Sequence, residues 1–226
     1  MRGGEREPVI TIDGPAGAGK STAARLLAER LGYRLLDTGA MYRALALGVL
    51  RAGLPPDDSP ELRRHLDDVE VALGDDRVYL NGRDVTGEIR SPEVGEATSR
   101  LTMLAPVRDK VTPLQRALAA GGGVVLEGRD TGTVVCPGAE LKFFLDASLE
   151  ARTRRRHEEL AGRGAVLPIE TVREEIVRRD AQDRGRALAP LRPASDAITI
   201  DTSGLTAAQV VEVMLRAVER LCCTRS

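Results

Sequence analysis

The stretch VITIDGPAGAGKST, residues 9–22, decides the fold of this chain. It opens with β-branched residues, which favour a strand, and its last residues begin a segment of helical spacing that closes at Gly32. Four of its residues fit the phosphate-loop pattern G-x-x-x-x-G-K-[ST]: Gly14, Gly19, Lys20 and Ser21. The stretch therefore predicts a strand, an anion-binding loop and a helix in succession.

The chemistry of such a loop is the binding of a nucleotide's phosphates. Glycines let successive backbone N–H groups turn toward an anion, and the N-terminus of the following helix adds partial positive charge. We expect the Lys20 ammonium to reach the β- and γ-phosphates and the Ser21 hydroxyl to ligand Mg²⁺, partly through water. Only three of the 33 basic residues are lysines, and one of them stands here.

The loop alone leaves the reaction open, because motor ATPases, GTPase switches and small-molecule kinases share it. A GTPase would be expected to carry N-K-x-D for guanine, and no such string occurs in the chain. A regulatory or motor ATPase usually has an apolar strand that ends in D-[DE]. The segment available here is VVLEGRD, residues 124–130, in which Glu127 is followed by glycine. Both of those classes are therefore disfavoured.

The overall charge speaks against a nucleic-acid partner. The 33 basic and 34 acidic residues nearly cancel, which leaves no global basic field. Aromatic residues make up only 2% of the chain, so a surface that holds single strands by base stacking would lack platforms. We expect small-molecule substrates and no nucleic acid.

The N-terminus and the cysteines indicate a cytoplasmic protein without a membrane anchor. Residues 1–8 are charged and lack the apolar core of a signal peptide, and the apolar stretch at 44–50 is far too short to span a membrane. Three cysteines show no C-x-x-C spacing and are expected to be reduced. Two histidines lie in charged surroundings and are expected to face solvent: His65 and His157.

Five short segments predict a parallel sheet, because the first of them alternate with helical patterns. They are residues 9–12, 34–36, 124–127, 141–146 and 197–202. Helical spacing covers residues 21–31, 38–50, 92–120 and 206–221. Two segments interrupt this pattern: residues 57–100, which contain a hairpin signal around Asp75 and Asp76, and the charged helical residues 149–186. We expect a single domain with a core of residues 8–56, 101–148 and 187–226.

Several segments together resemble the bacterial cytidylate (CMP/dCMP) kinases. Beside the glycine loop these are LDTGAMYR at 36–43, DVTGEIRSPEV at 84–94, LEGRDTGTVVCP at 126–137, RRDAQDRGRALAPLRP at 178–193 and DAITIDTS at 196–203. They occur in the family's order and run from about Pro8 to the last helix, so the resemblance covers nearly the whole chain. The insert that contains GEIR separates this group from adenylate kinases and from the shorter eukaryotic enzymes.

The resemblance implies an α/β fold: a P-loop parallel five-stranded sheet flanked by helices. It would carry a β-containing CMP-binding insert at 57–100 and a short helical lid at 149–186. The implied activity is Mg²⁺-dependent transfer of the ATP γ-phosphoryl group to CMP or dCMP, in pyrimidine nucleotide metabolism. We expect a monomer, because no amphipathic segment is left over to demand a dimer. ATP would be bound by the loop residues Gly14, Pro15, Ala16, Gly17, Ala18, Gly19, Lys20, Ser21 and Thr22.

The resemblance also implies roles for single residues. The catalytic residues would be Lys20, Arg155 as a lid arginine over the donor phosphates, and Arg179. CMP would be bound by Thr38, Arg43, Ser99, Arg108, Arg129, Asp130, Asp183 and Arg186. Within that set the resemblance gives phosphate to Arg43 and Arg129, cytosine to Ser99, Arg108 and Asp130, and ribose to Asp183 and Arg186. The chain departs from the family's usual residues at Thr131, Cys136 and Gln182.

The chemistry of the base agrees with these residue types. Cytosine presents an N4 amino donor beside two acceptors, so a selective site needs a carboxylate and two donors. Asp130 with Arg108 and Ser99 supplies that set. Uracil would place an acceptor against Asp130, an unpaired contact that costs a few kcal/mol. Two alternatives stay open: a kinase for another monophosphate, UMP or AMP, and a P-loop ATPase that binds RNA through the arginine run RTRRR at 152–156.

Overall fold

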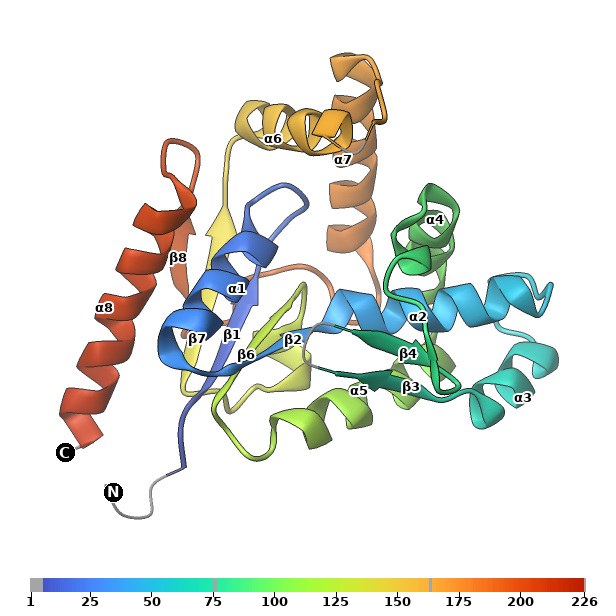
Figure 1. The fold of residues 1–226 in the computed structure, drawn as a ribbon, viewed down its shortest axis with the longest axis horizontal. Helices are drawn as coiled ribbons and strands as arrows, with labels where there is room; N and C mark the ends of the chain where they lie inside the picture. Colours follow the sequence, from blue (N-terminus) through green and yellow to red (C-terminus); the bar gives the residue numbers. More distant parts are fainter. Residues whose placement is uncertain (1–5, 75–76, 163, 226) are drawn as a thin grey trace. The chain divides into compact units, whose positions relative to one another are not determined.

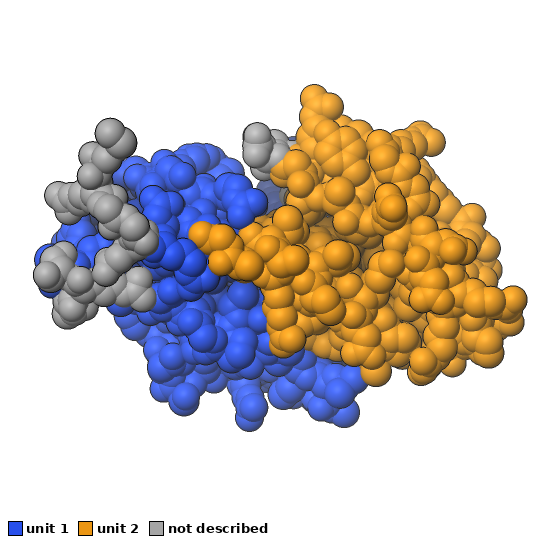
Figure 2. Space-filling model, turned by 90° about the horizontal axis from the view of Figure 1, so that it is seen from below, with its two compact units in different colours: residues 1–35, 122–226 blue, residues 36–121 orange. Residues whose placement is uncertain are grey.

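A computed structural model describes residues 6–74, 77–162 and 164–225, and the chain divides into two compact units. Unit 1 comprises residues 1–35 and 122–226, and unit 2 comprises residues 36–121 (Figure 2). The division into a core and two inserts that we expect from the sequence follows other boundaries and stays a prediction.

A parallel sheet in the strand order β2-β6-β1-β7-β8 belongs to unit 1, except that the last two residues of β2, Leu36 and Asp37, are counted in unit 2 (Figure 1). The strands are β1 (Val9–Asp13), β2 (Arg34–Asp37), β6 (Val124–Gly128), β7 (Leu141–Asp146) and β8 (Ile198–Asp201). The pairs β1–β6, β1–β7 and β7–β8 are parallel. All five residues of β1 are buried, as expected for the central strand of a sheet covered on both faces. The predicted five-stranded parallel sheet is confirmed.

Helices complete unit 1, and two of them close its apolar core. The helices are α1 (Lys20–Leu31), α6 (Leu149–Gly162), α7 (Ile169–Gly185) and α8 (Ala207–Arg225). Alternate residues of β1, Ile10 and Ile12, pack with Leu27 of α1, Phe143 of β7 and Met214 of α8. The other alternate positions, Thr11 and Asp13, therefore point to the opposite face of the sheet.

Unit 2 packs helices against a small antiparallel sheet. Its elements are α2 (Thr38–Arg51), α3 (Pro60–Asp68), β3 (Val71–Leu73), β4 (Val78–Leu80), β5 (Arg83–Asp84), the 3₁₀ turn η1 (Glu88–Arg90), α4 (Pro92–Leu101) and α5 (Ala105–Ala119). The predicted hairpin is confirmed as β3–β4, and β5 adds a third strand. The expected turn residues, Asp75 and Asp76, lie outside the described residues.

Three features of unit 2 differ from what the sequence leads us to expect. The helix expected over residues 92–120 is two helices, since Pro106 lies in the first turn of α5 and disfavours helical backbone before it. Helix α3, which Ser59 caps and Pro60 opens, precedes the hairpin and is not among the helices expected from the sequence. His65 is only partly exposed, and its Nε2 atom is buried.

The chain enters β6 through Gly122, which cannot be replaced without strain. Its φ is 71°, and a Cβ atom there would lie 2.0 Å from the Glu7 carbonyl oxygen. We expect Gly122→Ala to lower the free energy of unfolding by about 2 kcal/mol or more in urea denaturation. The neighbouring Gly121→Ala is the control, because no atom lies within 4 Å of its added methyl group. Equal stability of the two variants would contradict this prediction.

Candidate active site

The phosphate loop joins the central strand β1 to helix α1. Gly17 has a φ of 76°, and a Cβ there would lie 2.9 Å from the Arg152 carbonyl oxygen, so the loop packs closely on α6. Gly19 precedes α1 in left-handed conformation, and within the described residues no side chain caps this helix. The N–H groups of its first turn are therefore oriented for an anion.

Lys20 is buried at the start of α1. Its exposed fraction is 6%, and its Nζ donates to the Pro15 carbonyl oxygen at 2.7 Å. Burial, and then the nearby Arg129 guanidinium, hold the pKa of Lys20 well below its usual value, while Glu127 acts in the opposite direction. The charged form of the ammonium is penalised by burial, so an anionic phosphate at the loop would stabilise it.

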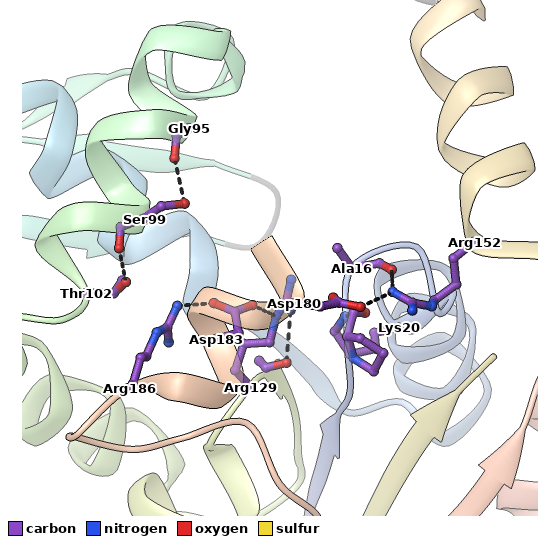
Figure 3. Close-up of polar contacts among 12 residues, drawn as sticks. Ala16, Lys20, Gly95, Ser99, Thr102, Arg129, Arg152, Asp180, Asp183 and Arg186 are labelled. Atoms are coloured by element: carbon purple, nitrogen blue, oxygen red, sulfur yellow. Dashed lines mark hydrogen bonds and ion pairs between the residues drawn. The ribbon is translucent and has the colours of Figure 1, made fainter. Parts of the chain in front are cut away.

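A buried arginine of α6 contacts the same loop. The Nη1 of Arg152 donates to the Ala16 carbonyl oxygen at 3.1 Å and to Asp180 Oδ2 of α7 at 2.6 Å (Figure 3). Arg152, at the start of the run RTRRR, is not among the site residues predicted from the sequence. No local signal separates it from the other arginines of that run.

Arg155, one turn further along α6, lies against the turn that follows β8. Its guanidinium donates to Thr202 Oγ1 at 3.0 Å and to the Thr202 and Leu205 carbonyl oxygens at 2.5 and 3.3 Å. The Thr202 hydroxyl in turn donates to the Ala18 carbonyl oxygen at 3.0 Å. Arg155 therefore lies one side chain away from the phosphate loop, and its role over the donor phosphates stays a prediction.

The end of β1 is tied to the turn that follows β6. Asp13 is buried and accepts from the Thr131 and Gly132 backbone N–H groups at 2.9 and 2.8 Å and from the Thr131 hydroxyl at 2.8 Å. Burial raises the pKa of Asp13, and these hydrogen bonds oppose that rise. Thr131 directly follows Asp130, which is proposed to bind cytosine, so Asp13 positions the backbone beside that residue. Asp13 is not among the site residues predicted from the sequence.

Three proposed CMP-binding residues form one cluster in unit 1. Asp183 of α7 accepts from Arg129 Nε at 2.9 Å and from the Arg186 guanidinium, and its side chain is only 3% exposed (Figure 3). Burial raises the pKa of Asp183, but Arg129, Arg186 and Arg179 outweigh burial and lower it overall. The structure thus brings Arg129, Asp183 and Arg186 together, with Arg179 close enough to act electrostatically.

Unit 2 carries four of the proposed CMP-binding residues, whereas Asp130 lies in unit 1. Arg108 is buried, donates to the Thr102 carbonyl oxygen at 3.3 Å, and its guanidinium lies 5.9 Å from the centre of the Tyr42 ring. Ser99 donates to the Gly95 carbonyl oxygen of its own helix at 3.2 Å, a common contact for a serine in a helix (Figure 3). Thr38 is buried at the first position of α2, and Arg43 lies one turn later in the same helix.

The side chains that the structure describes are compatible with a metal ion that is bound mainly by the phosphates of the nucleotide. These residues contain no group of three histidine, cysteine or acidic side chains that could hold a metal ion on their own. Ser21, exposed at the start of α1, offers the hydroxyl that a phosphate-bound Mg²⁺ takes as a ligand. Magnesium keeps several waters and binds through substrate phosphates, so the residues present are compatible with it.

A parallel sheet whose central strand leads through a glycine loop to a buried lysine defines a P-loop phosphate-binding protein. A solved structure of an uncharacterized protein from Eubacterium ventriosum has the same fold, with a TM-score of 0.54 at 12% identity over 94% of this chain and 99% of that one.

A protein-family model described as "Cytidylate kinase" matches residues 10–220. The cytidylate kinase of Pelotomaculum thermopropionicum is 52% identical over 92% of this chain and 94% of its own. That of Citrifermentans bemidjiense is 49% identical over 93% and 92%. The chain belongs to the cytidylate kinase family. Among the residues that the structure describes, no helix is long and apolar enough to span a membrane.

The arginine cluster around Asp183 predicts a pH dependence of stability. The folded-state pKa of Asp183 lies below the value of about 3.9 for an unfolded aspartate, so its contribution is present above that pH and is lost as the pH falls through the folded pKa. We expect Asp183→Asn to lower the free energy of unfolding at pH 7 by about 3 kcal/mol, because two largely buried guanidiniums lose their carboxylate.

The measurement is urea denaturation of both proteins between pH 7 and pH 3. The difference between wild type and Asp183→Asn should shrink as the pH falls below about 4. Asp109→Asn, at an exposed position of α5, is the control and should follow the wild-type curve. A difference that stays constant over this range would contradict the assignment.

Proposed function

We propose that this chain transfers the γ-phosphoryl group of ATP to CMP or dCMP, giving ADP and CDP or dCDP. The observation that carries the proposal is the identity of about half of all residues to cytidylate kinases along nearly the whole chain. The buried Lys20 in a complete phosphate loop supports it from the structure.

The donor side of the mechanism depends on charge neutralisation. Loop N–H groups and the Lys20 ammonium would hold the β- and γ-phosphates of ATP, and Arg179 would stabilise charge on the transferred group. Mg²⁺, when bound with ATP through the Ser21 hydroxyl and water, would neutralise phosphate charge. Arg155 would join this set from the lid.

The acceptor side requires orientation and no general base. The nucleophile is a phosphate oxygen of CMP, which is already ionised at neutral pH, so a site without a catalytic histidine is chemically sufficient. Arg43 and Arg129 would bind the acceptor phosphate, and Asp130 would accept from the cytosine amino group. Asp183 and Arg186 would position the ribose, and Thr38, Ser99 and Arg108 would complete the contacts to CMP.

The proposal extends to the location, the oligomeric state and the partners of the protein. We expect a cytoplasmic monomer whose partners are the two nucleotides and neither nucleic acid nor membrane. The net charge of −1 and the 2% aromatic content support the absence of a nucleic-acid partner, because neither favours binding of a polyanion.

The experiment is a coupled assay of ADP release with ATP and Mg²⁺, in which CMP, dCMP, UMP and AMP are added in turn. We expect turnover with CMP and dCMP well above that with UMP and AMP. Asp130→Ala should lower kcat/KM for CMP about 100-fold, because the buried residue loses the carboxylate that would accept from the cytosine amino group. Asp109→Ala, at the exposed surface of α5, should leave kcat/KM unchanged.

Other outcomes would revise the proposal in distinct ways. Equal turnover with UMP would leave a nucleoside monophosphate kinase without the cytosine selectivity. ADP release that is indifferent to every monophosphate would overturn the kinase assignment. If RNA stimulated that release of ADP, a P-loop ATPase that binds RNA through the arginine run at 152–156 would replace the kinase assignment.

A further inference from the structure

Arg152 is the buried member of an arginine run on α6. Its side chain is 7% exposed, whereas Arg154 is exposed and both Arg155 and Arg156 are partly exposed. Ala151 and Thr153 beside it are also buried, so this turn of α6 faces the interior of unit 1. A charge at such a position needs partners, because burial of an unpaired guanidinium costs several kcal/mol.

The partners of Arg152 come from three separate segments. Its Nε donates to the Ala147 carbonyl oxygen at 3.0 Å, just before α6 begins. Its Nη1 donates both to Ala16 in the phosphate loop at 3.1 Å and to Asp180 in α7 at 2.6 Å (Figure 3). Only arginine presents several donors in one rigid plane, so a single side chain fixes the three acceptors in relation to each other.

Two of the three acceptors, Ala16 and Asp180, belong to or adjoin residues with proposed roles in the reaction. Ala16 is a member of the loop that would hold the ATP phosphates. Asp180 directly follows Arg179 and precedes Asp183 by one helical turn, so its position sets the rotation of α7 about its axis. Asp180 is itself 5% exposed, and its Oδ2 atom receives the bond from Arg152.

We propose that Arg152 is a positioning residue for phosphoryl transfer. Its guanidinium holds the donor loop at Ala16 and helix α7 at Asp180, so that the loop and the proposed catalytic Arg179 keep one geometry. Arg152 acts through these two segments without touching either nucleotide. The inference rests on the proposed function, since it assigns Arg152 to the same reaction.

The test compares Arg152→Lys, Asp180→Asn and the double variant with wild type. Lysine keeps the charge and loses the fixed plane of donors, and asparagine keeps the shape of Asp180 and loses its charge. We expect Arg152→Lys to lower kcat at least 10-fold at saturating ATP and CMP, with KM for CMP changed less than 3-fold. The double variant should lose little more kcat than the worse single variant, because the two residues act as one unit.

The conditions of the kinetic measurement and one control variant separate positioning from a merely structural role. Kinetics are run well below the unfolding temperature of each variant and are referred to the folded protein, so a loss of stability alone leaves kcat unchanged. The matched control is Arg156→Lys with Glu159→Gln, an exposed ion pair of 2.9 Å on the same helix, which should leave kcat unchanged.

The outcomes keep this inference apart from the proposed function. Wild-type protein without CMP-dependent ADP release would overturn the proposed function, and the inference with it. If the wild-type protein turns over normally, either of two results would overturn the inference alone. The first is a kcat of Arg152→Lys within 2-fold of wild type, and the second is a loss of kcat in the double variant that equals the combined losses of the single variants. If Arg152→Lys fails to fold, an unchanged kcat in Asp180→Asn would likewise overturn the inference alone.

Discussion

The acidic side chains buried near the phosphate loop are paired or hydrogen-bonded, mostly by segments that are distant in sequence. Asp13 accepts hydrogen bonds from the turn after Asp130, Asp180 is paired through its Oδ2 atom with Arg152, and Asp183 is paired with Arg129 and Arg186. A buried charge without such partners would be ionised only at a cost of several kcal/mol. Each pair therefore also specifies where a strand end or a helix must lie, and together they connect β1, β6, α6 and α7 within unit 1.

The same network supplies what phosphoryl transfer requires. The acceptor oxygen is already charged, so the protein has no proton to remove and contributes orientation and charge stabilisation. Orientation demands side chains that cannot rotate freely, and buried ion pairs restrict rotation more than exposed ones do. Lys20 is a buried cation without such a carboxylate pair in the contacts described above, and burial together with nearby guanidiniums lowers its pKa. A triphosphate bound at the loop would reverse that effect, so the lysine is suited to an anionic ligand.

The sequence predicts the framework of unit 1 well, because its signals are local. The β-branched segments, the glycine loop and the helical spacing after Lys20 each contain the information that forms them, and the structure confirms all five strands. In unit 2 the hairpin is confirmed, while α3 and the break before Pro106 are missed. The signals for both features are short capping sequences, Ser59-Pro60 and Pro106. A prediction based on longer periodic patterns does not detect them.

The site is harder to predict than the fold, and the arginines of α6 show why. Arg152 and Arg155 are three residues apart, lie on the same side of the helix, and have the same chemistry. What distinguishes them is the set of acceptors they meet: Asp180 and Ala16 for Arg152, Thr202 and Leu205 for Arg155. Those acceptors come from other parts of the chain, so the choice between the two arginines is made by tertiary packing. A run of identical charges therefore does not by itself show which of its members is buried against a carboxylate, and only the packed structure shows that.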